Sequence, residues 1–512
     1  MLDHPRVHAH PAGDLDLEAD VVVVGTGAGG AVFASELAEA GLKVIMLEKG
    51  GHWDRRDFDQ KEATMMPRLY EDAGARTTAD GGISVLHASC VGGTTVINNA
   101  ICFHPPAFVL QDWADRHGVR GVSLETLDPS LRKVEFVLNV QPISDGELNE
   151  NARLMRQGVE KLGLKGAAFR HNRTGCAQSG FCMVGCSYDR KQTMLVTYVP
   201  RALHFGAELY PFAKAERVVA QGRRVTAIEG SIVDHGTGKS YRFRVRAKVY
   251  AIAGGAISTP LLLLQSDVAN SSGRVGTNLR LHPIVPAFAT FDHEVKAYKG
   301  IPQGYYVDQF LQRSDGSGGY LLESIFTHPA IVGATVPEAG AELRQMMTRL
   351  NHLASAYVQV LDHGSGRVTV GAHGRPAIAY AVDAADQAKI RDGLKHLVRI
   401  LLAAGAREVA VPHVDLPRFS RPDDVDAGID RLDFAVGKLS TFSAHQMGTC
   451  PMGEDPSQSV VNSQLRAHDL DNLFVTDSSV FPTAIGVNPQ ITIASLATHA
   501  ARGVVSERAR YF

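Results

Sequence analysis

A glycine-rich stretch near the start of the chain constrains its fold more than any other feature. Residues 21–24 are four valines, the composition of a buried parallel strand, and Gly25, Gly27 and Gly30 follow at the spacing G-x-G-x-x-G. In a dinucleotide-binding turn, the first of these glycines bends the chain, the second lets the backbone approach a pyrophosphate, and the third lets the next helix pack closely on the strand. The pattern therefore predicts a strand, a tight turn and a helix whose first N–H groups face a phosphate.

A second strand and an acidic residue complete this pattern. Residues 44–47 are apolar and end at Glu48, eighteen residues after Gly30, where a carboxylate can accept hydrogen bonds from ribose hydroxyls. Glu48 thus favours NAD or FAD over a cofactor with a 2′-phosphate. Ala28 and Gly29 lie within the same turn and are candidate cofactor-binding residues. A glycine-rich loop in an unrelated α/β domain is the alternative interpretation.

The composition is that of an ordinary globular protein. Of the 512 residues, 45% are hydrophobic and 21% are charged, and the net charge of −2 gives no electrostatic signal for a nucleic-acid partner. Residues 1–18 lack a basic stretch followed by an apolar one, and the apolar run 261–264 is too short to span a bilayer. We therefore expect a cytoplasmic protein without a transmembrane segment that does not bind nucleic acid.

Two further segments have the composition of cofactor contacts. After the glycine turn, a pair of glycines precedes small hydroxyl residues, so the backbone at Gly93 and Thr94 can lie flat against a planar ligand, with Asn98 near its ring system. Residues 248–256 repeat the pattern of a buried strand followed by glycines. Between these segments, residues 214–245 alternate in the manner of an antiparallel meander.

The C-terminal region combines an acid, a histidine and a helix start. Residues 472–476 have strand composition and end at Asp477, while Pro489 is well placed in the first turn of a helix that runs toward Arg502. The positive end of that helix would stabilise negative charge on a ligand in front of it. In the same region, His445 stands three residues before a Gly-Thr pair.

Residues 286–437 have the pattern of a separate, mixed domain. Segments 366–370 and 377–382 predict paired strands, and an apolar face over residues 390–401 predicts a helix. Another helix is predicted around residues 149–162.

Taken in order, these segments resemble the glucose-methanol-choline (GMC) family of FAD-dependent alcohol oxidoreductases, from about residue 18 to the end of the chain. The resemblance implies an α/β fold with a Rossmann-like FAD-binding domain built from discontinuous segments and a mixed α+β substrate domain. The expected FAD-binding segments are 18–103, 213–285 and 438–512, and the substrate domain with its insertions comprises 104–212 and 286–437. Some members link the flavin covalently through a histidine just before the residue that matches Asn98. Here that position is Ile97, so the implied FAD is non-covalent.

The resemblance also implies roles for single residues. His445 would take the proton from a substrate hydroxyl and Asn488 would hold the same oxygen, so that the carbinol C–H points at flavin N5 for hydride transfer. Val218 matches the residue whose backbone meets the adenine. The complete set expected to bind FAD is Gly25, Gly27, Ala28, Gly29, Gly30, Glu48, Gly93, Thr94, Asn98, Val218, Asp477, Asn488, Gln490 and Thr492.

The implied reaction is oxidation of a CH–OH group to a carbonyl. A primary alcohol, either aliphatic or on a sugar-like or aminoglycoside-like carrier, is the expected substrate class, and oxygen, a quinone or a cytochrome is the electron acceptor. A lyase with a structural flavin is the alternative from another class, because the same fold hosts such enzymes. A protein that only binds FAD would need neither His445 nor Asn488.

Three cysteines lie close together in the sequence, at Cys176, Cys182 and Cys186. Three thiolates could ligate an iron–sulfur cluster, although the common clusters take four cysteines and no fourth is near, and no histidine stands at zinc-ligand spacing inside the segment. Within the family, sugar dehydrogenases that reduce a cytochrome have a similar spacing with a cluster, whereas bacterial long-chain alcohol oxidases have a related stretch generally without one. We expect plain thiols in a tight loop, with a cluster as the alternative.

Overall fold

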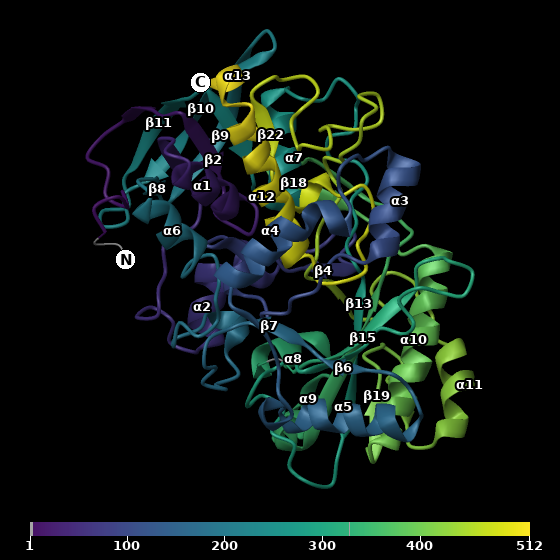
Figure 1. Cartoon of the computed structure of the whole chain (residues 1–512). Coiled ribbons are helices and arrows are strands. Elements are labelled where there is room, and N and C mark those ends of the chain that lie inside the picture. Colours follow the sequence, from purple (N-terminus) through teal and green to yellow (C-terminus); the bar gives the residue numbers. More distant parts are fainter. Residues whose placement is uncertain (1–3, 327) are drawn as a thin grey trace.

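A five-stranded parallel sheet organises the upper part of the molecule in Figure 1, where both termini lie. The computed structural model describes residues 4–326 and 328–512. All neighbouring strands of this sheet are parallel. Their spatial order is β22 (Leu473–Val475), β12 (Val249–Ile252), β2 (Val21–Val24), β3 (Val44–Leu47) and β8 (Glu208–Tyr210). With β2 in the centre and the glycine turn at its carboxyl end, the sheet confirms the predicted Rossmann-like α/β fold.

Helices pack against this sheet and against one another. α1 (Gly30–Glu39) follows the glycine turn directly, and nine of its ten residues are buried because its side chains are mostly apolar or small. It packs on α6 (Tyr198–His204) and on α12 (Gln490–Ser506), and α12 in turn packs on α4 (Leu124–Val137). The helix predicted to follow Pro489 is therefore α12, and it lies directly beside the helix of the glycine turn.

A four-stranded sheet extends this half of the molecule. The strands β9 (Ala213–Gln221), β10 (Arg224–Val233) and β11 (Ser240–Arg246) are antiparallel neighbours, which confirms the predicted meander. β1 (Leu15–Glu18) adds to its edge in parallel with β11. α7 (Gly255–Ser266), the helix after β12, packs on β9 and brings the meander against the central sheet.

A mixed sheet dominates the lower part of Figure 1. Its strands are β20 (Arg418–Phe419), β19 (Glu408–Ala410), β13 (Ile284–Thr290), β16 (Leu353–Val360), β15 (Tyr320–Ser324), β14 (Tyr305–Val307) and β6 (Ala167–Ala168), with β21 (Thr441–Ser443) pairing to β13 and β4 (Ile83–Val85) pairing to β21. Two helices pack on it, α5 (Glu150–Lys161) and α10 (Ala384–Ala403), both at predicted positions. β4 and β21 come from segments expected in the FAD-binding domain, and β8 comes from a segment expected in the substrate domain, so the two predicted units share sheets.

The remaining elements are short. The strands predicted at 366–370 and 377–382 are confirmed as the hairpin of β17 (Arg367–Val370) and β18 (Pro376–Ala379), and β5 (Val140–Pro142) pairs with β7 (Arg170–Asn172). The other helices are α2 (Glu62–Leu69), α3 (Ala107–His117), α8 (Pro329–Thr335), α9 (Gly340–Thr348), α11 (Val425–Asp430) and α13 (Arg508–Tyr511). Within the described ranges, every helix is too short or too polar to cross a membrane.

Candidate active site

The glycine turn fits between the ends of three strands, and at three of its glycines other backbone atoms lie too close for any side chain. Gly25 has a φ of 99°, and a Cβ added there would lie 2.3 Å from the carbonyl oxygen of Ala253, just after β12. A Cβ on Gly29 would lie 1.6 Å from the carbonyl oxygen of Thr476, just after β22. Gly25, Gly29 and Gly30 are thus required by the close approach of other backbone atoms, whereas a Cβ on Gly27 would make only ordinary contacts.

A cavity of about 300 Å³ runs from this turn to the mixed sheet. Most of the predicted cofactor-binding residues line it, namely Gly25, Gly27, Ala28, Gly29, Glu48, Gly93, Thr94, Asn98, Asp477, Asn488 and Gln490, and so does His445. Gly27 and Gly93 face each other across two bare stretches of backbone, since a Cβ on Gly93 would lie 2.7 Å from the Gly27 Cα. The structure therefore brings the separate sequence segments to one site.

Three predicted residues do not line the cavity. Gly30 packs against the turn itself, and Thr492 is fully buried inside α12. The backbone N–H of Val218 donates to the Ser266 hydroxyl at 2.9 Å, and the part of β9 that reaches the cavity is 213–215. The contact between Val218 and the adenine thus remains a prediction. The lining of the cavity does not favour it, because Val218 lies outside that lining.

Glu48 is fixed at the end of β3 with its carboxylate facing the cavity. Its Oε2 accepts hydrogen bonds from the Thr26 backbone N–H at 3.0 Å and the Thr26 hydroxyl at 2.7 Å, and its Oε1 accepts one from the Gly50 N–H at 2.9 Å. Burial raises the pKa of the Glu48 carboxyl, while these hydrogen bonds oppose the rise. The Thr26 hydroxyl also accepts from Gly92 N–H at 3.0 Å, so Thr26, which sequence reasoning did not single out, links the glycine turn to the loop around Gly93.

Asp477 and the loop at Asn98 are held by similar contacts. The Asp477 carboxylate accepts from the Gly255 N–H at 2.8 Å and the Thr259 hydroxyl at 2.5 Å, which anchors it at the start of α7. The Asn98 side chain donates to the Gln490 amide oxygen at 2.6 Å, at the first residue of α12. The first N–H groups of α12 therefore face the cavity beside Asn98, as its position predicts.

The predicted catalytic pair is brought together at the other end of the cavity. The Asn488 Nδ2 lies 3.4 Å from the His445 Nε2, and both side chains line the cavity although 43 residues separate them. Burial lowers the pKa of His445 to about 4, so its ring is neutral at neutral pH. A neutral imidazole whose Nε2 accepts from an amide has a lone pair on that nitrogen and is able to take up a proton.

A second histidine, which sequence reasoning did not single out, packs against this base. His282 is fully buried, and its ring meets that of His445 edge to face with the centroids 5.5 Å apart. Its Nε2 accepts a hydrogen bond from Gly486 N–H at 2.9 Å, in the loop that leads to Asn488. His282 therefore contacts the His445 ring directly and also holds the loop that carries Asn488. Its only local sequence signal is a His-Pro step, which usually marks a turn.

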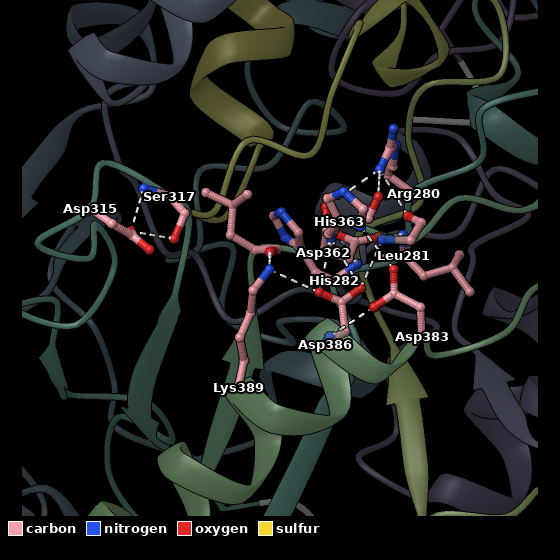
Figure 2. Close-up of polar contacts among 12 residues, drawn as sticks. Arg280, Leu281, His282, Asp315, Ser317, Asp362, His363, Asp383, Asp386 and Lys389 are labelled. Carbon is pink, nitrogen blue, oxygen red and sulfur yellow. Dashed lines mark hydrogen bonds and ion pairs between the residues drawn. The ribbon is translucent and has the colours of Figure 1, made fainter.

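A buried carboxylate holds the backbone at His282 in a strained conformation. The φ of His282 is 47°, in the left-handed region that side chains disfavour. Asp362 accepts hydrogen bonds from the N–H groups of Leu281 at 2.9 Å and His282 at 3.2 Å, and from the Tyr380 hydroxyl at 2.8 Å. Figure 2 shows Asp362 and His282 within this network of polar contacts. These hydrogen bonds offset the strain and fix the ring that packs on His445.

The three cysteines of the segment lie beside the cofactor loop and do not line the main cavity. Cys176, Cys182 and Cys186 are free thiols around a small cavity of about 30 Å³, and burial raises the pKa of Cys182 to about 12. In the part of the chain that the structure describes, no three His, Cys, Asp or Glu side chains are grouped to hold a metal ion. The iron–sulfur alternative therefore gains no support, and a protonated Cys182 is consistent with plain thiols.

Comparison with known proteins identifies the family. Residues 66–284 and 362–497 match models of the GMC oxidoreductases, and residues 23–82 match a model of NAD(P)-binding Rossmann-like domains. The chain belongs to the GMC oxidoreductase family, as its motifs predict. As a member of that family, it is an oxidoreductase.

Two curated relatives illustrate the similarity. A long-chain-alcohol oxidase of Arabidopsis thaliana is 30% identical, and the match covers 94% of this chain and 66% of that protein. An uncharacterized GMC-type oxidoreductase of Mycobacterium tuberculosis is 32% identical, with 96% of this chain and 76% of that protein covered.

Solved structures share the fold at low identity. A pyridoxine 4-oxidase from Mesorbium loti superposes with a TM-score of 0.70 at 19% identity, covering 94% of this chain and 98% of that one. A formate oxidase from Aspergillus oryzae, studied for modification of its FAD, superposes with a TM-score of 0.71 at 15% identity, covering 97% of this chain and all of the other. These similarities confirm the fold class.

Proposed function

We propose that the protein is an FAD-dependent enzyme that oxidises a primary alcohol to an aldehyde, with His445 as the general base. The observation that carries the proposal is the pairing of a neutral, buried His445 with Asn488 at 3.4 Å, in the same cavity as the glycine turn. Relatives that are named alcohol oxidases, among them the plant long-chain-alcohol oxidase, support the reaction class. Their description as oxidases favours oxygen as the electron acceptor over a quinone or cytochrome.

The residues that line the cavity fit FAD. Gly27 and Gly93 approach each other closely, and both line the cavity with bare backbone, against which a pyrophosphate and a flat ring system could lie. Glu48 at the end of β3 would accept the ribose hydroxyls, and Asn98 with Gln490 would flank the flavin. Ile97 carries no nucleophilic atom, so the cofactor would be held without a covalent bond. Bound FAD would supply the acceptor for the two electrons that the alcohol loses.

The chain's own side chains would perform the proton transfer. The lone pair on His445 Nε2 would take the hydroxyl proton while the Asn488 amide donates to the same oxygen. The C–O bond would become a carbonyl as the carbinol hydrogen leaves with its electron pair for the FAD that the cavity would hold. The first N–H groups of α12 would favour negative charge on a cofactor bound beside them. The low pKa of His445 keeps the base unprotonated before each turnover.

The lining near His445 favours an aliphatic substrate. Ile284, Ile325 and Phe442 border the cavity on this side, whereas Gln303 and Tyr357 supply its polar atoms. Burial of an alkyl chain against such side chains is favourable by about 0.8 kcal/mol per CH₂ group. A sugar alcohol would leave several hydroxyl groups facing apolar surface, which is costly.

Anaerobic mixing with a panel of alcohols tests the proposal. We expect straight-chain primary alcohols to bleach the flavin absorbance, faster as the chain lengthens from four to twelve carbons, and a sugar alcohol of similar size to bleach it far more slowly. Oxygen uptake after aeration would identify an oxidase. A flavin that no alcohol reduces would refute the oxidoreductase reading of this site and favour acid–base chemistry on a structural flavin.

A further inference from the structure

A buried cation lies behind the loop that lines the cavity at Asn98. Lys191 is only 3% exposed, and its Nζ donates to the backbone oxygens of Val96, Asn98 and Cys182, each at 2.7 Å. Three acceptors at this distance use all three N–H groups of an ammonium, whereas a neutral amine has only two donors. The contacts therefore assign Lys191 the charged form.

No carboxylate of the described residues balances this charge. The titratable groups that act on Lys191 are the thiols of Cys90, Cys182 and Cys186. Burial raises the pKa of Cys182 to about 12 and also raises the pKa of Cys90, so both thiols are uncharged at neutral pH. An ammonium that has lost its hydration without gaining a counter-ion is costly, and negative charge brought near it lowers that cost.

The cation lies on the side of the cavity where α12 begins. The Asn98 carbonyl accepts from Lys191, and the Asn98 side chain donates to Gln490, the first residue of α12. The acidic residues in the cavity lining are Glu48 and Asp477, and the donors to their carboxylates belong to other segments of the chain. The Asn98 side of the cavity thus has two sources of positive potential, the ammonium and the first N–H groups of α12.

We propose that the charge of Lys191 raises the reduction potential of bound FAD, because it favours the reduced cofactor over the oxidised one. A hydride carries two electrons and one proton, so its transfer from the alcohol adds one negative charge to the cofactor. The ammonium acts on that charge through the loop at Asn98, without touching cofactor or substrate. The inference rests on the proposed binding of FAD in this cavity and adds to the proposed function a residue that tunes the acceptor.

A thermodynamic cycle separates this role from mere support of the loop. The potentials of bound and free FAD differ by the ratio of the dissociation constants of the oxidised and reduced forms. A looser loop weakens the binding of both forms alike and leaves that ratio unchanged, whereas loss of a nearby positive charge weakens the reduced form more. Two unit charges about 10 Å apart interact by on the order of tenfold at an effective dielectric constant of about 20. Tenfold corresponds to about 30 mV for a two-electron couple.

The test measures the midpoint potential of bound FAD against reference dyes, without oxygen and at saturating FAD. Lys191→Met should lower the potential by about 30 mV, the tenfold effect of the lost charge, and Lys191→Arg, which keeps the charge, should restore most of it.

Thr95→Val is the matched control for a looser loop. The Thr95 hydroxyl donates to the Gly92 oxygen at 2.7 Å and accepts from the Met194 N–H at 3.0 Å, so it ties down the same loop without a charge. This variant should weaken FAD binding and keep the wild-type potential. An unchanged potential in Lys191→Met, or an equal fall in Thr95→Val, would overturn the proposal.

A second measurement needs neither a variant nor a substrate. Wild type should bind reduced FAD with a dissociation constant at least about tenfold below that of oxidised FAD. Reduced FAD bound no more tightly than oxidised FAD overturns the role of Lys191, even if Lys191→Met takes up no cofactor. If the potential falls in Lys191→Met but no alcohol reduces the flavin, the proposed function fails while the electrostatic role of Lys191 stands.

Discussion

Replacement of Lys191 by Met should loosen the cofactor loop. The Lys191 ammonium is buried between the cysteine segment and the loop, and its Nζ donates to three carbonyl oxygens, those of Val96, Asn98 and Cys182, each at 2.7 Å. Burial lowers the pKa of Lys191, since no carboxylate shares the site. Met fills nearly the same volume but leaves these carbonyl groups without their donor.

The magnitude follows from the three contacts. A hydrogen bond to a charged group contributes about 1.5–3 kcal/mol to stability. The hydration that the ammonium loses on burial offsets part of this contribution. We expect the variant to lose about 3–5 kcal/mol of unfolding free energy, the range typical of breaking a buried charged contact. Since two of the carbonyls belong to the loop at Asn98, we also expect FAD to dissociate at lower denaturant than in wild type.

Urea unfolding followed by free-flavin fluorescence measures both effects. The exposed Lys239→Met is the control, and its urea midpoint of unfolding should equal that of wild type. Unchanged midpoints for Lys191→Met, with FAD retained to the same urea concentration, would refute the reasoning that this ammonium holds the loop.

Three further predictions concern the turn, the strained histidine and the base. Gly29→Ala should abolish FAD binding, measured by the flavin content of the purified protein, because its Cβ would lie 1.6 Å from a carbonyl oxygen, whereas Gly13→Ala, with no atom within 4 Å, should bind normally. Asp362→Asn should slow flavin reduction about 10-fold and cost about 1–3 kcal/mol in unfolding free energy, because it weakens the contacts that hold His282; an unchanged rate would contradict that role. The pKa of His445 is about 4 in the folded protein and 6.5 in the unfolded chain, so protons bind the unfolded chain first as pH falls. Wild type should therefore lose up to about 3 kcal/mol of unfolding free energy between pH 6.5 and pH 4. In the same pH series, His445→Gln should lack this contribution to the loss.

Local sequence patterns predicted the cofactor half of the site. The valine strand, the glycine turn and the acid at Glu48 lie within one βαβ unit, where spacing along the chain fixes spacing in space. The family resemblance then added His445 and Asn488, and the structure brings them to the cavity of the glycine turn. Chain position is informative for the glycine turn and Glu48 because they follow β2 and β3, which are neighbours in one parallel sheet.

The remaining residues depend on contacts between distant segments. His282 meets His445 across 163 positions, so it has no signal at any fixed spacing. Val218 shows the opposite case, in which the expected residue lies on the right strand but a few positions beyond the part that reaches the cavity.

The most direct test of the account is the rate of flavin reduction in His445→Ala. Wild type and variant, each confirmed to hold FAD, would be mixed without oxygen with a straight-chain primary alcohol, and the loss of flavin absorbance followed in time. The account predicts a decrease of 10²-fold or more, the effect of losing a general base, with FAD content unchanged. Reduction of the variant at the wild-type rate would contradict the central claim that His445 takes the proton of the alcohol.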